Sequence, residues 1–139
     1  MNDVSLDRVR VVMSQVLSDV PEVAAAYAYG SRVAGRPMPG SDLDIALVLA
    51  AGVRGDDPLL AERVAGRVAS ELQASVEIDA HIADDLPLPV QGRVVTQGVL
   101  VFERDPVRRV DFETSTRRLY FDFLPFLERD AKIGLAARG

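Results

Sequence analysis

Two aspartates separated by a single residue, Asp42 and Asp44, stand at the start of an otherwise apolar segment, DLDIALVLA. In a strand, residues i and i+2 project from the same face, so the two carboxylates would lie together, with Cα atoms roughly 6.5–7 Å apart. Like charges held side by side repel unless a cation compensates them. Mg²⁺ accepts one or two carboxylates and keeps other positions for water and phosphate oxygens. The pair therefore predicts a magnesium site for a phosphorylated substrate.

A third acid comes from SVEIDAHIA, residues 75–83, whose strict alternation predicts a strand with Asp79 on its polar face. If this strand lies beside the one that carries Asp42 and Asp44, the three acids converge. Such a triad can hold two metal ions about 3.5–4 Å apart, an arrangement suited to phosphoryl transfer. Glu77 shares the polar face, and a modest change of register would make Glu77 the third acid instead.

Gly30 and Ser31 lie a short distance before the acids. Gly30 ends the apolar segment VAAAYAY and allows close approach of the backbone to a ligand, and Ser31 is expected to open a brief helix over residues 31–34. Amides at a helix N-terminus, together with the Ser31 hydroxyl, can bind triphosphate oxygens. We therefore expect Gly30 and Ser31 to bind a nucleotide beside the metal.

Simpler interpretations of the same residues stay open. A D-x-D pair can be a solvated strand end, and Ser31 can be a helix N-cap and nothing more. His81 is the only histidine, and a lone histidine is more often structural than catalytic. Arg32 and Arg36 flank the expected phosphate site, but solvated loop arginines would give the same pattern.

The positions of Gly, Pro and apolar residues predict the elements that carry these groups. We expect a single α/β (α+β) domain in which helices flank the strands. Helices are expected over residues 5–18, 58–73 and 87–98, with Ser5 as an N-cap and Pro58 in a first turn, and strands over 23–29, 42–50, 75–83 and 99–105.

The C-terminal segment, residues 110–135, carries apolar residues at helical spacing, and Pro125 is expected to kink or break this helix. By default its aromatic run is expected in the core. The aromatic residues are too many for one face of the helix, so the alternative to burial in the core is a surface that binds a partner. The run comprises Tyr120, Phe121, Phe123 and Phe126.

Composition limits the class of protein. A chain of 139 residues with 48% hydrophobic and 27% charged residues is long enough for one domain, residues 1–139. It has no cysteine, and its start lacks the pattern of a signal peptide, so we expect a cytoplasmic protein with no membrane contact. The net charge of −5 argues against direct nucleic-acid binding, because such binding depends on neutralising phosphates.

Gly30-Ser31, ten residues, and then Asp42-Leu43-Asp44 resemble the G-S-x10-D-x-D signature of the DNA polymerase β-like nucleotidyltransferase superfamily. Asp79 stands where that superfamily has its third carboxylate. The segments GSRVAGRPMPGSDLDIAL and RRLYFDFLPFLERD are similar to the antitoxins of HEPN/MNT toxin–antitoxin pairs, which are minimal nucleotidyltransferases (MNT). The resemblance covers nearly the whole chain, although only the signature and the third acid are specific.

The resemblance implies a palm-like mixed β-sheet flanked by helices and a Mg²⁺-dependent transfer of AMP from ATP. The implied acceptor is a tyrosine of a partner HEPN ribonuclease toxin, which AMP addition silences. It also implies that Asp42, Asp44 and Asp79 are catalytic metal ligands for two Mg²⁺ ions, and that Gly30 and Ser31 bind the nucleotide. The alternatives are an antitoxin that only occludes its toxin, or a minimal nucleotidyltransferase acting on a small-molecule or RNA hydroxyl.

Overall fold

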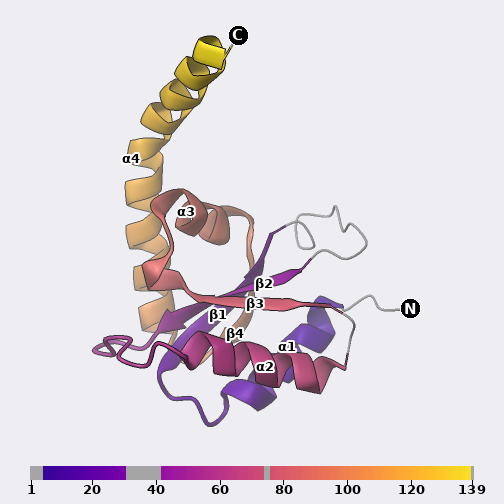
Figure 1. The fold of residues 1–139 in the computed structure, drawn as a ribbon. Coiled ribbons are helices and arrows are strands. Elements are labelled where there is room, and N and C mark those ends of the chain that lie inside the picture. Colours follow the sequence, from indigo (N-terminus) through magenta and orange to yellow (C-terminus); the bar gives the residue numbers. More distant parts are fainter. Residues whose placement is uncertain (1–4, 31–41, 74–75, 139) are drawn as a thin grey trace.

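Four strands form one mixed β-sheet in the computed structural model, which describes residues 5–30, 42–73 and 76–138 (Figure 1). The order across the sheet is β3-β2-β1-β4. β1 runs antiparallel to both β2 and β4, whereas β2 and β3 are parallel and are joined through a helix. The strands are β1 (Val23–Tyr29), β2 (Leu43–Leu49), β3 (Ile78–Ile82) and β4 (Val99–Glu103).

Helices α1 (Leu6–Leu17) and α2 (Leu60–Leu72) cover one face of the sheet. The Ser5 hydroxyl caps α1 by accepting a hydrogen bond from the amide of Arg8 at 3.1 Å, as predicted. Alternate residues of β2 pack against these helices in the main core, because successive strand side chains point to opposite faces. These core residues of β2 are Leu43, Ile45, Leu47 and Leu49.

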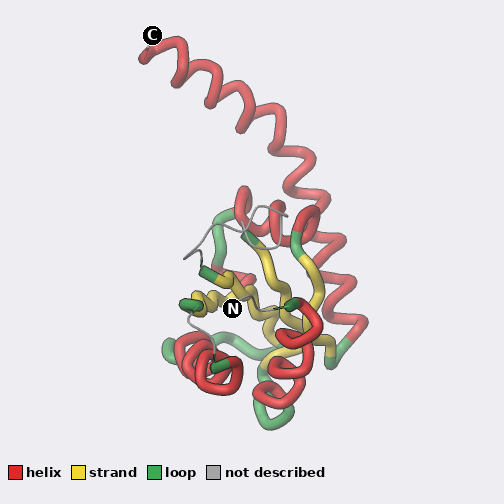
Figure 2. The backbone as a smooth tube through the Cα atoms, turned by 90° about the vertical axis from the view of Figure 1, so that its right-hand side faces the viewer, coloured by secondary structure: helices red, strands yellow, loops and turns green. Residues whose placement is uncertain are grey.

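Helices α3 (Leu88–Gln97) and α4 (Pro106–Arg138) cover the opposite face, and the short 3-10 helix η1 (Ala83–Asp85) follows β3. Phe112 of α4 packs with Tyr27 of β1 and Val48 of β2 in a second apolar cluster. Figure 2 shows α4 running past the edge of the sheet and away from the other elements. None of the helices that the structure describes has the length and hydropathy needed to cross a membrane.

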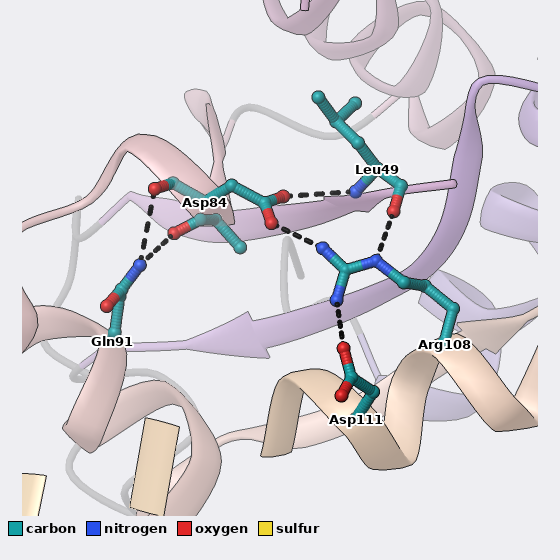
Figure 3. A network of polar contacts seen from close by, with 6 residues as sticks. Leu49, Asp84, Gln91, Arg108 and Asp111 are labelled. Atoms are coloured by element: carbon teal, nitrogen blue, oxygen red, sulfur yellow. Dashed lines mark hydrogen bonds and ion pairs between the residues drawn. The ribbon is translucent and has the colours of Figure 1, made fainter. Parts of the chain in front are cut away.

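A polar network holds α4 against the ends of β2 and η1 (Figure 3). Arg108 of α4 donates from Nε to the carbonyl oxygen of Leu49 at 2.9 Å and forms an ion pair with Asp84. The second Asp84 carboxylate oxygen accepts the Leu49 amide at 3.2 Å. The Arg108–Asp84 ion pair thus joins α4 to η1, and both partners also bond to the backbone of Leu49 in β2. These contacts fix the position of α4 on the sheet.

Most of the predicted elements are confirmed to within a few residues, with one exception. Pro58 lies before α2, not in its first turn, because α2 begins at Leu60 after a turn in which the Asp57 carboxylate accepts the Leu59 amide. Of the two outcomes expected at Pro125, the structure shows the kink: the C-terminal helix continues through Pro125 as α4, with a visible bend in its C-terminal half (Figure 1). The brief helix expected over residues 31–34 lies outside the described residues.

The default expectation for the aromatic run of α4 is wrong. Phe121, Phe123 and Phe126 are each more than half exposed, and Leu119 is exposed as well. The physical reason is that the helix outruns the sheet, so only its first part has a surface to pack against. Of the aromatic residues in α4, Phe112 is in the core.

Candidate active site

Three residues on adjacent strands form a row at one end of the sheet. In the antiparallel pair Tyr29 of β1 lies opposite Asp44 of β2, and in the parallel pair Asp44 lies opposite Asp79 of β3. Directly paired residues project from the same face, which here is the face covered by α3 and α4, because Asp44 shares its side of β2 with Ala46 and Val48. The prediction that the third strand lies beside the second is therefore confirmed.

Gly30 closes this row at the end of β1. Its φ of +93° is a conformation that favours glycine, and a Cβ atom built on it would lie 2.3 Å from the Oδ2 atom of Asp44. Thus the Asp44 carboxylate fills the space that a side chain at position 30 would occupy. The structure explains the glycine by contact with the acid as well as by backbone conformation.

The row concentrates negative charge in a half-buried setting. Burial raises the pKa of Asp44 above its ordinary value, and the neighbouring carboxylates of Asp79 and Asp42 raise it further, while His81 acts in the opposite direction. Burial, followed by the charges of Asp44 and Asp79, raises the pKa of Tyr29 to about 12. A cation bound here would relieve a repulsion that the fold itself imposes.

The donor chemistry suits Mg²⁺, which in proteins is bound through one or two carboxylates. Asp44 and Asp79 offer such a pair. Asp79 also contacts His81, with 3.1 Å between His81 Nε2 and Asp79 Oδ1, and both side chains are about half exposed. Within residues 5–30, 42–73 and 76–138, no three His, Asp or Glu side chains are already arranged around one ion position. The fit is therefore to a carboxylate pair, not to a preformed triad.

The other predicted residues are placed as follows. Asp42 lies just before β2 and is half-buried, close enough to affect the pKa of Asp44. Glu77 lies just before β3, where its carbonyl accepts the Leu43 amide at 2.9 Å. By the register of the two strands, Asp79 is directly opposite Asp44, whereas Glu77 lies two residues before that position. Ser31, Arg32 and Arg36 lie outside the described residues.

Two residues near the acids are absent from the sequence-based site. The sequence could have predicted that Tyr29 lies near the site, since it ends a strand directly before Gly30. Its neighbour across the sheet, however, is known only from the register. Arg93, an exposed residue of α3, lies near enough to Tyr29 for its charge to favour the ionised phenol. No spacing in the sequence links residue 93 to residue 29, so only the packing of α3 on the sheet reveals it.

A pocket on the other side of the sheet is separate from this site. It has a volume of about 550 Å³ and lies between α2 and the turn that follows α1. Its apolar lining comes from Val20, Leu60 and Val64, and Arg63 and Arg67 are among its charged residues. The arginines form ion pairs with Asp57 and Asp19. Because the acids face α3 and α4, this pocket is not part of the candidate active site.

The mixed sheet brings acidic side chains from two parallel strands together, beside a strand-ending glycine, and such an arrangement suits an enzyme that transfers nucleotidyl groups. The family model described as "Polymerase beta, Nucleotidyltransferase" matches residues 13–107, more than half of the chain. The chain belongs to this nucleotidyltransferase family. The match extends from α1 into the start of α4 and so includes the whole sheet.

Solved structures share the fold. A chain of a toxin–antitoxin crystal structure with AMP-PNP superposes with a TM-score of 0.68 at 24% identity, covering 92% of this chain and 98% of that one. A mutant of the toxin–antitoxin pair MntA–HpeT gives 0.68 at 22% identity, with 97% and 99% covered. A tri-AMPylated Shewanella oneidensis HEPN toxin in complex with MNT antitoxin gives 0.67 at 22%, with 96% and 99% covered. No curated protein matches the sequence.

Proposed function

We propose that this chain is the antitoxin of a HEPN/MNT pair, and that it transfers AMP from ATP to a tyrosine hydroxyl of its HEPN toxin in a Mg²⁺-dependent reaction. The observation that carries the proposal is the pairing of Asp44 with Asp79 across β2 and β3, with Gly30 against the Asp44 carboxylate. An acidic row on a nucleotidyltransferase fold is the arrangement that metal-assisted transfer of a nucleotidyl group requires.

In this proposal Asp42, Asp44 and Asp79 are the catalytic metal ligands, with two Mg²⁺ ions bound during the reaction. The raised pKa of Asp44, caused by burial and by the other two acids, supports this assignment, since uncompensated negative charge is a feature of cation sites. Gly30 and Ser31 bind the nucleotide. Asp79 is preferred to Glu77 because Asp79 is the register partner of Asp44.

The transfer joins the acceptor oxygen to the α-phosphorus of ATP. The tyrosine oxygen forms the new P–O bond, the bond between the α-phosphorus and the bridging oxygen breaks, and pyrophosphate leaves with that electron pair. Bound Mg²⁺ supplies charge neutralisation of the phosphates and of the developing charge on both oxygens. The three carboxylates would hold Mg²⁺, and Asp79, which is exposed whereas Asp42 and Asp44 are half-buried, would accept the phenolic proton. Catalysis of this kind consists mainly of positioning and electrostatics.

The relatives support the choice of partner and nucleotide. One similar chain comes from a toxin–antitoxin structure with AMP-PNP, an ATP analogue, and another from a structure that holds a tri-AMPylated HEPN toxin. These likenesses are the reason to propose ATP as the donor and a HEPN toxin as the acceptor. They cover nearly the full length of both chains, which supports residues 1–139 as one minimal nucleotidyltransferase domain.

The experiment incubates the chain with its cognate HEPN toxin, Mg²⁺ and ATP labelled on the α-phosphate. The wild type is expected to place the label on a toxin tyrosine, identified by mass spectrometry, and Asp44→Asn is expected to slow transfer by about 100-fold or more. Asp56→Asn is the matched control, since Asp56 is an exposed aspartate in the loop after β2.

Two results would contradict the proposal. One is transfer by Asp44→Asn at the wild-type rate. The other is neutralisation of the toxin without any label, retained in the double variant Asp42→Asn/Asp44→Asn, which would identify an antitoxin that acts by occlusion. Label on a small molecule or an RNA end instead of the toxin would point to the remaining alternative.

A further inference from the structure

The C-terminal part of α4 extends beyond the rest of the molecule in both views (Figures 1 and 2). Before this part, Thr116 of the helix is buried, and the ring of Tyr120 lies against Gly92 of α3. Of the described side chains that follow Tyr120, none is buried. We call residues 119–138 the α4 arm.

The described part of the α4 arm carries a stripe of exposed apolar side chains. Leu119, Phe123 and Phe126 are 51%, 51% and 57% exposed, and their spacing of i, i+4 and i+7 places them on one face of the helix. The rings of Phe123 and Phe126 contact each other with centroids 6.1 Å apart, yet more than half of each side chain stays in solvent. Clustered exposed aromatics of this kind are typical of a protein interface, and this spacing is typical of a helix bound in a groove.

The arm originates on the face of the sheet that carries the acids. Phe112, in the first part of α4, packs with Ala46 and Val48 of β2, and these residues lie on the same side of β2 as Asp44. The opposite face is covered by α1 and α2. A protein bound to the arm is therefore held on the same side of the sheet as the transfer site.

We propose that the α4 arm docks the protein that accepts AMP, by inserting Leu119, Phe123 and Phe126 into an apolar groove of that partner. The inference rests on the proposed function, which makes the HEPN toxin the occupant. A folded protein acceptor needs contacts beyond the reacting hydroxyl, and the arm offers apolar contacts on the acid-bearing face. The superposition on the MntA–HpeT chain covers 97% of this chain. Because the residues before the arm make up less than that share, the superposition must include the arm. The arm is therefore part of the fold shared with a chain from a toxin–antitoxin structure.

The test compares two double variants of the full chain. Phe123→Ala/Phe126→Ala removes the stripe, and Val11→Ala/Val107→Ala removes exposed apolar side chains of α1 and of the α4 N-terminus, outside the arm. Alanine favours helix, so both variants are expected to fold, as circular dichroism can verify. The Kd for the HEPN toxin is measured by calorimetry, and AMP transfer is measured over a range of toxin concentrations.

The arm variant is expected to raise the Kd and the KM for toxin at least tenfold with little change in kcat, because aromatic anchors dominate interface affinity, while the control variant behaves as wild type. An unchanged Kd in the arm variant overturns the docking proposal. So does a wild-type chain that binds no toxin. A third result would also overturn it: the wild type dimerises through the arm in the absence of toxin, and the arm variant loses dimerisation but keeps the wild-type Kd for toxin. If the wild type binds toxin but transfers no AMP, the proposed function fails, and the Kd comparison still decides the docking.

Discussion

Gly30 and Asp44 share one space: a Cβ atom on the glycine would lie 2.3 Å from the Oδ2 atom of the aspartate. The contact joins the end of β1 to the start of β2, on the two sides of the segment that the resemblance singles out. Asp44, a proposed metal ligand, can therefore keep its position only if residue 30 has no side chain.

Gly30→Ala is expected to lower AMP transfer at least tenfold, because the methyl group displaces the Asp44 carboxylate. It should also destabilise the fold by about 1–2 kcal/mol, the usual cost of a positive φ in a non-glycine residue. Gly52→Ala is the matched control, since Gly52 has a φ of +81° and open space around its Cβ position. Equal losses of transfer in the two variants would refute the contact as the cause.

Gly92 of α3 has a packing role that can be tested in the same way. A Cβ atom there would lie 2.1 Å from Cδ1 of Tyr120, so Gly92→Ala is expected to lower the free energy of unfolding by about 1–3 kcal/mol through overpacking. Gly66→Ala in α2, where the Cβ position is open, should instead raise it by about 0.5–1 kcal/mol. Urea unfolding measures both values.

The double variant Gly92→Ala/Tyr120→Ala provides the check on this assignment. If the ring is the obstacle, its removal makes the Gly92→Ala substitution less costly than it is in the wild-type background, and the two effects are not additive. Full additivity would show that Gly92 matters for another reason.

Stability is expected to fall at alkaline pH because of two tyrosines. Burial, followed by its hydrogen bond to Glu113 at 2.8 Å, raises the pKa of Tyr27 far above its ordinary value, and the pKa of Tyr29 is raised to about 12. In the unfolded chain both phenols ionise near pH 10. The folded state therefore holds their protons more tightly, and this stabilisation is complete below pH 10 and is lost as the pH rises toward the folded pKa values, over pH 10 to 12 for Tyr29.

The double variant Tyr27→Phe/Tyr29→Phe should show a flatter dependence of the free energy of unfolding on pH above pH 10 than the wild type. Denaturant titrations at a series of pH values measure this slope, and the ultraviolet absorbance of phenolate follows the ionisation itself. A slope identical to that of the wild type would show that neither phenol is responsible.

The sequence by itself determined the strands, most of the helices and the acids. The i, i+2 spacing of Asp42 and Asp44 placed them on one face of a strand, and strict alternation in SVEIDAHIA placed Asp79 on a polar face, because a strand's side chains alternate with a period of two. Gly30 could be predicted to end a strand because it directly follows the apolar segment VAAAYAY. Helix α3 and the Ser5 cap were also readable, since turn residues and caps act over a few positions.

The tertiary structure decided what those residues lie beside. That Asp79 and not Glu77 is opposite Asp44 depends on a parallel register, which is set by packing between segments far apart in the chain. The charge of Arg93 acts on Tyr29 only because α3 packs on β1. The aromatic residues of α4 have the same hydrophobicity whether buried or exposed. It is the length of the helix beyond the sheet that leaves Phe123 and Phe126 in solvent, and periodicity along one helix carries no information about where its neighbours end.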